Sequence, residues 1–232
     1  MLLKYYAGLF DACGDVKLFY FGRPKNKNIY RSIIINNDNI LLLRKVKSYF
    51  GYGLVKDRYW IVDKKECIAD FCSRISLYTT LNLMCLDLML KSCNIIFGSD
   101  KSKNKPQAVE IHDEIVKLFI SGAHNINDIT FSSPPEPEWT AGFIEGNKNR
   151  FDISLSCKQE NIKYSIKKQH TADDEISKSF CVIETENKKS LIEYLQQVIP
   201  FLFIEKESIF SLYKSIHLSC PPFYGIVSKN IR

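Results

Sequence analysis

The sequence of 232 residues predicts an α+β protein built from two copies of one unit of helices and strands. Three observations lead to this prediction. A short motif recurs 134 residues later in the chain, strand-like runs follow both copies, and segments with helical spacing follow the strands. Hydrophobic residues make up 45% of the chain and charged residues 25%, a composition typical of a globular core and not of a disordered chain.

The first copy has the clearer succession of elements. We expect a helix over 2–13, a strand over 16–21, a turn over 22–28 that contains Pro24, and a return strand over 30–36. A helix over 39–50 is expected to end at Gly51, because glycine readily adopts the left-handed conformation that closes a helix. The elements that follow are a hairpin of 54–57 with 59–63 and two helices over 65–76 and 80–91.

The second copy is matched to the first by three similarities. Tyr6-Ala-Gly-Leu-Phe-Asp-Ala-Cys-Gly14 resembles Thr140-Ala-Gly-Phe-Ile-Glu-Gly-Asn-Lys148, at an offset of 134. At an offset near 122, Asn39-Ile40 with the basic run 44–47 matches Asn161-Ile162 with Lys167-Lys168, and Trp60-Ile-Val62 matches Cys181-Val-Ile183. The second copy is therefore 12 residues shorter. Since 151–158 matches the return strand, the first strand and its turn are expected to be missing there.

The segment between the copies sets the expected domain boundaries. It contains a basic run over 101–105, a helical pattern over 106–121 and a proline-rich stretch over 132–138. The predicted division is a first repeat over 1–97, a linker with one helix over 98–135, and a second repeat over 136–232.

Small residues are concentrated in the two copies of the short motif. In a helix, residues four positions apart lie on one face, and small side chains there allow two helix backbones to approach closely. The residues expected to pack in this way are Ala7, Gly8 and Ala12 in the first copy and Ala141, Gly142 and Gly146 in the second.

These two motifs resemble the signature helices of single-chain LAGLIDADG homing endonucleases. Phe50–Trp60 resembles the G-x-G turn and following hairpin of that family, and Leu191–Leu202 resembles a later helix that ends in a Pro-Phe turn. The resemblance covers nearly the whole chain. It implies a monomer of two αββαββα units whose signature helices pack at a pseudo-twofold axis, and whose sheets form a saddle over DNA.

The resemblance also implies where a metal would bind. In the family, a carboxylate at the eighth motif position of each helix holds a divalent cation that faces the scissile phosphates. Magnesium prefers oxygen ligands, and metal-bound water is the nucleophile. The eighth positions here are Cys13 and Asn147, a thiol and a neutral amide, which are poor magnesium ligands. We therefore expect no catalytic residues, no metal and no other cofactor.

Other acids lie close to these positions. Asp15 and Asp152 could act as displaced metal ligands, and an active site-specific DNA homing endonuclease stays open as an alternative on that ground. Asp11 and Glu145 occupy the sixth motif position, where the resemblance implies helix packing and capping.

Alternation along the strands predicts which side chains face outward, on the side that binds nucleic acid in the family. Val16, Leu18 and Tyr20 are expected to face the helices, and outward cations can neutralise phosphates. The expected nucleic-acid-binding residues are Lys17, Phe19, Phe21, Arg23, Lys25, Lys27, Arg31, Lys56 and Arg58 in the first copy and Arg150, Lys158, Lys163, Lys167 and Lys168 in the second.

Outward aromatic rings favour an RNA ligand. Phe19 and Phe21 suit stacking on unpaired bases, although they would also suit a protein interface. We therefore expect an inactive endonuclease descendant that binds structured RNA in preference to DNA. An organellar rRNA-binding ribosome component or assembly factor, with ribosomal proteins as neighbours, and an intron-maturase-like protein are the concrete versions. A purely structural scaffold protein remains the further alternative.

Composition adds limits on partners and location. The formal net charge of +6 permits a nucleic-acid partner without requiring one, and no apolar run is long enough to span a membrane. The eight cysteines form no C-x-x-C pair, so reduced core cysteines are expected rather than a zinc site. Abundant Ile and Asn, whose codons are A/T-rich, favour the mitochondrion or another organelle.

Overall fold

The computed structural model describes residues 2–23, 26–94, 110, 113–114, 129–131, 135–147, 151–154, 163–169, 178–184, 188–203, 210 and 214. In the strands, side chains are described for 14–18, 30–36, 54–56, 59–62 and 131, and the backbone alone for the rest. The chain divides into two compact units. Unit 1 comprises Met1–Ala12 and Ile126–Arg232, and unit 2 comprises Cys13–Asn125. The first signature helix thus groups with the second repeat.

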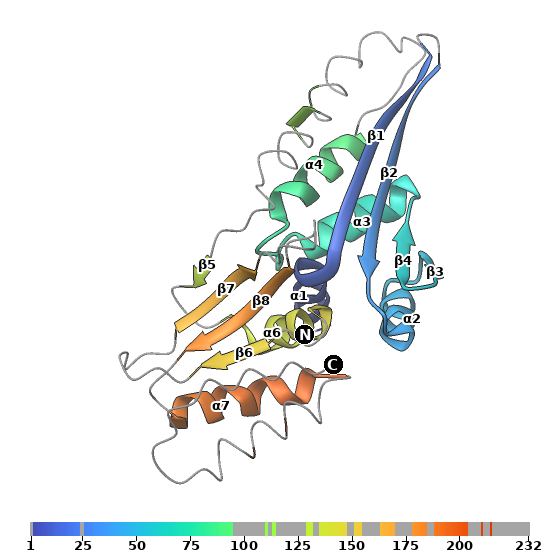
Figure 1. Ribbon diagram of the computed structural model, residues 1–232. Coiled ribbons are helices and arrows are strands. Elements are labelled where there is room, and N and C mark those ends of the chain that lie inside the picture. The colour runs from blue at the N-terminus through green and yellow to red at the C-terminus, as the bar shows by residue number, and fades with distance from the viewer. Residues whose placement is uncertain are drawn as a thin grey trace. The chain divides into compact units, whose positions relative to one another are not determined.

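Helices and strands are mixed along the chain, which confirms the α+β prediction (Figure 1). The helices are α1 (Leu2–Cys13), α2 (Ile40–Phe50), α3 (Lys65–Ile75), α4 (Leu83–Asn94), α6 (Pro137–Gly146) and α7 (Lys188–Val198), with the 3₁₀ turn η1 (Ile199–Phe201) after α7. The strands are β1 (Gly14–Arg23), β2 (Asn26–Asn36), β3 (Leu54–Lys56), β4 (Tyr59–Val62), β5 (Ile129–Phe131), β6 (Phe151–Ser154), β7 (Lys163–Gln169) and β8 (Lys178–Glu184). No described helix is long and apolar enough to cross a membrane. The basic run 101–105 and most of the helix expected over 106–121 lie outside the described residues.

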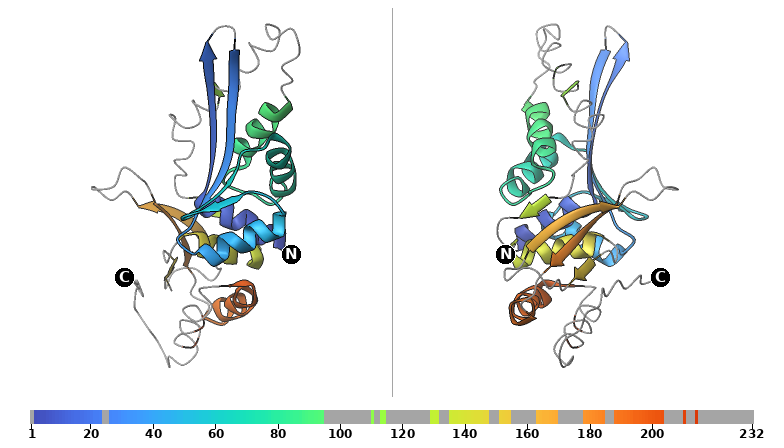
Figure 2. Two further views of the ribbon diagram at one scale, coloured as in Figure 1. Left: turned by 90° about the vertical axis from the view of Figure 1, so that its right-hand side faces the viewer. Right: turned by 60° about the vertical axis from the view of Figure 1, so that its left-hand side comes forward.

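Unit 2 is an antiparallel sheet of order β1-β2-β4-β3 with helices on one face. Figures 1 and 2 show α3 and α4 along one side of the long β1–β2 hairpin. The side chains of Val16, Leu18, Ile33 and Ile35 are buried, and they alternate with the residues of the opposite face. We call the helix-covered face the core face and the opposite one the outer face.

An aromatic cluster fixes the second half of unit 2. Phe50, the last residue of α2, packs against Trp60 and Phe71, with ring centroids 5.7 and 5.0 Å apart. Asn39 directly precedes helix α2 and caps it, because its side chain accepts a hydrogen bond from the Leu42 N–H at 3.0 Å. It ends at Gly51, which has a φ of 80° and so adopts the predicted left-handed cap.

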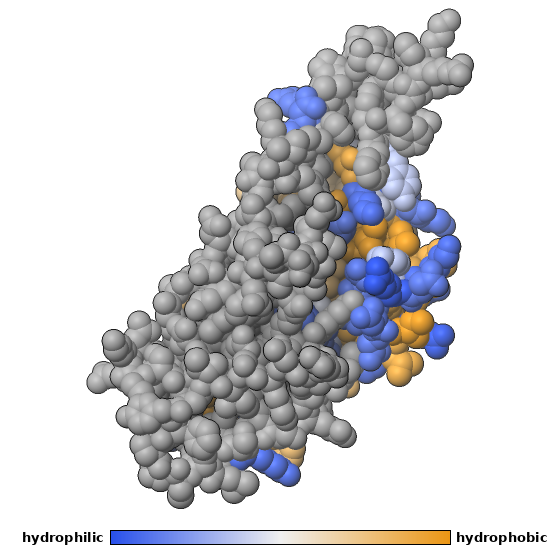
Figure 3. Space-filling model, in the orientation of Figure 1, coloured by the Kyte–Doolittle hydropathy of each residue, from blue (hydrophilic) through white to orange (hydrophobic). Residues whose placement is uncertain are grey.

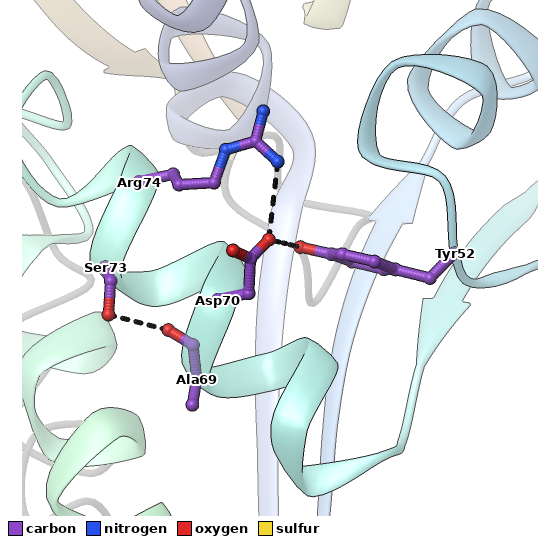
Figure 4. A network of polar contacts seen from close by, with 5 residues as sticks. All are labelled: Tyr52, Ala69, Asp70, Ser73 and Arg74. Atoms are coloured by element: carbon purple, nitrogen blue, oxygen red, sulfur yellow. Dashed lines mark hydrogen bonds and ion pairs between the residues drawn. The ribbon is translucent and has the colours of Figure 1, made fainter.

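The turn after α2 is bound to α3. The Tyr52 hydroxyl donates to Asp70 Oδ2 at 2.7 Å, and Arg74 approaches the same oxygen at 3.3 Å (Figure 4). Burial, with the hydrogen bond to Asp70, raises the pKa of the Tyr52 phenol. Gly53 has a φ of 86° and lies against the Trp60 indole, which donates to the Tyr52 carbonyl at 3.1 Å. The turn Gly51–Gly53 therefore links α2 to β3 and holds both against α3 and Trp60.

Unit 1 has a four-stranded sheet of order β5-β7-β8-β6. Strand β6 is parallel to β8, whereas the other pairs are antiparallel. The edge strand β5 comes from residues that precede α6, and β7 occupies the place beside β8 that β2 occupies beside β4. The match of 151–158 to the return strand is therefore wrong, because β6 lies at the other edge of the sheet.

The segments 39–47 and 161–168, which the sequence comparison matched to each other, do not form the same kind of element. The similarity of 39–47 to 161–168 pairs helix α2 with strand β7. In Lys163–Gln169 the apolar residues Tyr164 and Ile166 alternate with polar ones, as in a strand, and the shared lysines carried no information on periodicity. The match of Trp60–Val62 to Cys181–Ile183 does join two strands, β4 and β8.

Candidate nucleic-acid interface and metal positions

The signature helices α1 and α6 of unit 1 pack so closely that their backbones are in contact. A Cβ atom on Gly8 would overlap the carbonyl oxygen of Trp139, and one on Gly142 would overlap the carbonyl oxygen of Tyr5. The two helices thus exclude any side chain at these glycines.

The remaining small residues extend this contact. Ala7 and Ala141 are fully buried, and Gly146 lies against Ala12 near the C-terminal ends of the two helices. Because early residues meet early residues and late ones meet late ones, α1 and α6 run in the same direction.

The sixth motif positions are joined to aromatic donors on the opposite helix. The Trp139 indole donates to Asp11 Oδ2 at 3.0 Å, and the Tyr5 hydroxyl donates to Glu145 Oε2. Glu145 Oε1 also accepts from the Phe203 N–H at 2.5 Å. Both acids are buried. These contacts give Asp11 and Glu145 a packing role, since buried carboxylates need such partners.

The eighth motif positions come at the ends of these helices. Cys13 is the last residue of α1 and is half-buried. Asn147 follows α6 directly; its N–H bonds to the carbonyls of Phe143 and Ile144 at 3.1 and 3.2 Å. Its side-chain Nδ2 is buried without a hydrogen-bond partner among the described residues. The Cys13 thiol is too soft a ligand for magnesium, and the neutral Asn147 carboxamide would leave the charge of the cation uncompensated. The described residues contain no group of three or more potential metal ligands.

Of the two acids considered as displaced ligands, one has a described side chain. Asp15 is half-buried on the outer face, opposite Ile34 of β2. Asp152 lies opposite Val182 of β8, and its side chain is outside the described residues.

The outer face of unit 2 exposes cations and an aromatic ring. Lys17 is exposed on β1, and Lys56 is exposed on the edge strand β3. Arg58 lies in the β3–β4 turn, where its Nε donates to the Tyr59 hydroxyl at 3.1 Å. That hydrogen bond raises the pKa of Arg58, which stays charged.

Tyr30 is a candidate that the sequence reasoning missed. It is 41% exposed and lies directly opposite Phe19 in the β1–β2 register, on the same face as Lys17. The alternation that identified Phe19 could have found it, because Tyr30 has the opposite parity to Ile33 and Ile35 in the return strand.

The expectation that Arg31 belongs to the nucleic-acid-binding surface is wrong, because Arg31 lies on the core face. The register places it opposite Leu18 on the core face, where its Nε donates to Ser92 Oγ at 2.9 Å and its Nη2 donates to the Ser92 carbonyl at 2.5 Å. Burial lowers the pKa of its guanidinium. Arg31 therefore connects β2 to α4. Its charge alone suggests an outward position, but it lies two residues before Ile33 and so shares the core face with that residue.

The other expected binding residues have no described side chain. Phe19, Phe21, Arg23 and Lys27 lie in β1 and β2, and Lys163, Lys167 and Lys168 lie in β7, with the backbone alone described. Lys25, Arg150 and Lys158 lie outside the described residues. Their assignment stays a prediction.

Comparison with solved structures identifies the fold. The chain matches the homing endonuclease I-SmaMI bound to its uncleaved DNA target with a TM-score of 0.59 and 16% identity, over 94% of this chain and 91% of that one. It matches I-CpaMI bound to uncleaved DNA with a TM-score of 0.57 and 14% identity, over 93% and 90%. I-GzeII with its DNA target gives 0.57 and 15% over the same shares.

The chain has the LAGLIDADG homing endonuclease fold. Comparison with protein-family models and with curated protein sequences gives no match. Within this fold, the described residues place an amide and a thiol at the ends of the signature helices and cations on the outer face of the unit 2 sheet.

Proposed function

We propose that this protein binds nucleic acid through the outer face of the unit 2 sheet without cleaving it, and that structured RNA is its preferred ligand. Two observations support nucleic-acid binding. Solved structures with the same fold hold DNA, and the outer face of unit 2 exposes Lys17, Lys56 and Arg58. Cations on a sheet face neutralise backbone phosphates whether the polymer is DNA or RNA.

The absence of cleavage rests on the eighth motif positions. Phosphodiester hydrolysis by this fold is expected to need carboxylates there, because a divalent cation must be held by charged oxygens. Cys13 and Asn147 supply neither charge nor the required pair of oxygens. This donor set is the observation that carries the proposal.

The preference for RNA rests on the aromatic character of the outer face. Tyr30 exposes its ring, and Phe19 lies opposite it in the strand register. Aromatic rings on a sheet stack on unpaired bases, which loops of a folded RNA offer and a closed duplex does not. The composition of the chain favours an organelle, so rRNA of a mitochondrial ribosome is the first ligand to test.

Binding can be measured by fluorescence anisotropy with folded organellar rRNA fragments and with duplex DNA of equal length, from low to high salt. We expect tighter binding to RNA, and a weaker salt dependence for a Lys17→Gln/Lys56→Gln variant. Tighter binding to duplex DNA at one defined site would contradict the RNA preference. Binding of neither polymer would leave the scaffold alternative.

One observation favours a second candidate, an active DNA homing endonuclease. Asp15 lies two residues after Cys13, at the start of β1, and is half-buried on the outer face. A metal held by Asp15 would restore cleavage, which a nuclease assay with Asp15→Asn as the control distinguishes from simple binding.

A further inference from the structure

The exposed side of helix α2 carries three cations and no anion. Its sequence, ILLLRKVKSYF, contains no acidic residue. Helical spacing places Leu42, Leu43, Val46 and Phe50 on the buried side. Arg44, Lys45 and Lys47 are exposed, and we call these three residues the α2 basic arc.

Local helix electrostatics do not account for this composition. A cation in the last turn stabilises a helix through its dipole, and Lys47 fits that role. The effect falls off beyond the last turn, so it does not explain Arg44. Arg44 and Lys47 form no ion pair with a described carboxylate. Their charge is therefore available to an external anion.

The arc does not belong to the outer face. Phe50 packs against Trp60, which is fully buried on the core face of the sheet, so α2 covers the core face. The exposed side of α2 consequently points away from the sheet. The arc is a surface separate from the one that carries Lys17 and Tyr30.

The edge strand β3 connects the two surfaces. Lys56 lies on β3 and Arg58 in the turn that follows, and the Arg58 carbonyl accepts from the Asn37 N–H at 2.9 Å, just before α2. Figure 1 shows α2 next to the β3–β4 hairpin, and Figure 3 shows hydrophilic side chains among apolar ones over this part of unit 2. Asp38 and Asp57 are also exposed there. The α2 basic arc together with Lys56 and Arg58 thus makes five exposed cations against these two exposed acids.

We propose that the α2 basic arc is a second phosphate-binding surface, contacted by the same nucleic acid after its backbone turns around the β3 edge. This rests on the proposed nucleic-acid binding. The chemistry selects a polyanion, since three cations without an acid within one helix suit backbone phosphates. A straight duplex on the outer face would have to bend sharply to reach α2, at a cost in free energy. A folded RNA presents backbone in several directions and reaches both surfaces.

The test replaces the arc by neutral residues in the full chain. Glutamine has a helix propensity close to that of lysine and arginine, so Arg44→Gln/Lys45→Gln/Lys47→Gln should keep α2, which circular dichroism verifies. The slope of log Kd against log salt should fall by about 0.7–0.9 for each lost phosphate contact, which is about 2.1–2.7 for all three cations. The loss of affinity should be largest at low salt.

A matched control removes the same charge elsewhere in unit 2. Lys64 directly precedes α3, Lys65 lies on α3, and Lys91 lies on α4 in an ion pair with Asp87. All three are exposed, so Lys64→Gln/Lys65→Gln/Lys91→Gln should keep the wild-type slope. The charge-conserving variant Arg44→Lys/Lys45→Arg/Lys47→Arg should also keep it. An unchanged slope in the arc variant, or equal losses in both neutral variants, would overturn the inference while wild-type binding persists. If the wild-type protein binds neither RNA nor DNA, the proposed function itself is refuted.

Discussion

Trp139 of α6 donates its indole N–H to the Asp11 carboxylate of α1 across 3.0 Å. The pair has a counterpart, because Tyr5 of α1 donates its hydroxyl to Glu145 of α6. Tyr5 and Trp139 are 134 positions apart, and so are Asp11 and Glu145. The repeat offset found in the sequence is thus reproduced in a reciprocal pair of contacts, which hold the two signature helices together without using either eighth position.

Removing one donor should destabilise unit 1. Tyr5→Phe deletes a single hydroxyl and leaves the buried Glu145 with one partner fewer, so we expect the free energy of unfolding to fall by about 1–3 kcal/mol. Tyr30→Phe, at an exposed site, should change it by less than about 0.5 kcal/mol. Urea denaturation measures both, and a double-mutant cycle with Glu145→Gln isolates the coupling. Equal effects of the two tyrosine variants would contradict the assignment.

The glycines of the helix contact should be irreplaceable. Gly8→Ala and Gly142→Ala place a methyl group on a carbonyl oxygen of the partner helix, and separating the helices should cost about 3 kcal/mol or more. Gly51→Ala is the control, because its added Cβ meets no atom within 4 Å and the cost arises only from the φ of 80°. That control should lose about 1 kcal/mol in denaturant unfolding. A larger loss for Gly51→Ala than for Gly8→Ala would show that the helices can separate easily.

Sequence reasoning succeeded where a local physical rule decided the structure. The cap at Gly51, the glycines of α1 and α6, and the hairpin of β3 with β4 follow from backbone conformation and periodicity. It failed where non-local pairing decided. Strand β5 is recruited from residues before α6, and β6 pairs in parallel with β8, and neither pairing has a signal in the residues themselves. Arg31 was misplaced by charge alone, although its parity with Ile33 was available.

The correction of Arg31 can be tested by separating stability from binding. Arg31→Gln loses the hydrogen bonds to Ser92, so the free energy of unfolding should fall by about 1–3 kcal/mol, while the salt dependence of nucleic-acid binding stays that of the wild type. Lys17→Gln should do the reverse, with a lower salt slope and unchanged stability. Calorimetry and anisotropy supply the two readouts, and a reduced slope for a stably folded Arg31→Gln would restore the original assignment.

Thiol reactivity should follow burial. Burial raises the pKa of Cys85 to about 11, so about 0.1% of it is thiolate at pH 8, and burial also raises the pKa of Cys72 and Cys93. Cys13 and Cys67 are half-buried. Among the five cysteines whose side chains the structure describes, we expect iodoacetamide to label Cys13 and Cys67 first in the native protein, as measured by peptide mass spectrometry over time. Early labelling of Cys72 would show that the α3 packing opens readily, because Cys72 is fully buried.

We propose that this protein keeps the endonuclease fold but does not cleave nucleic acid, because Cys13 and Asn147 stand at the two positions where carboxylates would hold the metal. The most direct test of this claim incubates the pure protein with Mg²⁺ or Mn²⁺ and a randomised duplex DNA library, and sequences the ends that form. We expect no site-specific ends above those from protein without metal. Defined breaks that disappear in Asp15→Asn or Asp152→Asn would contradict the claim and establish an active endonuclease with displaced ligands.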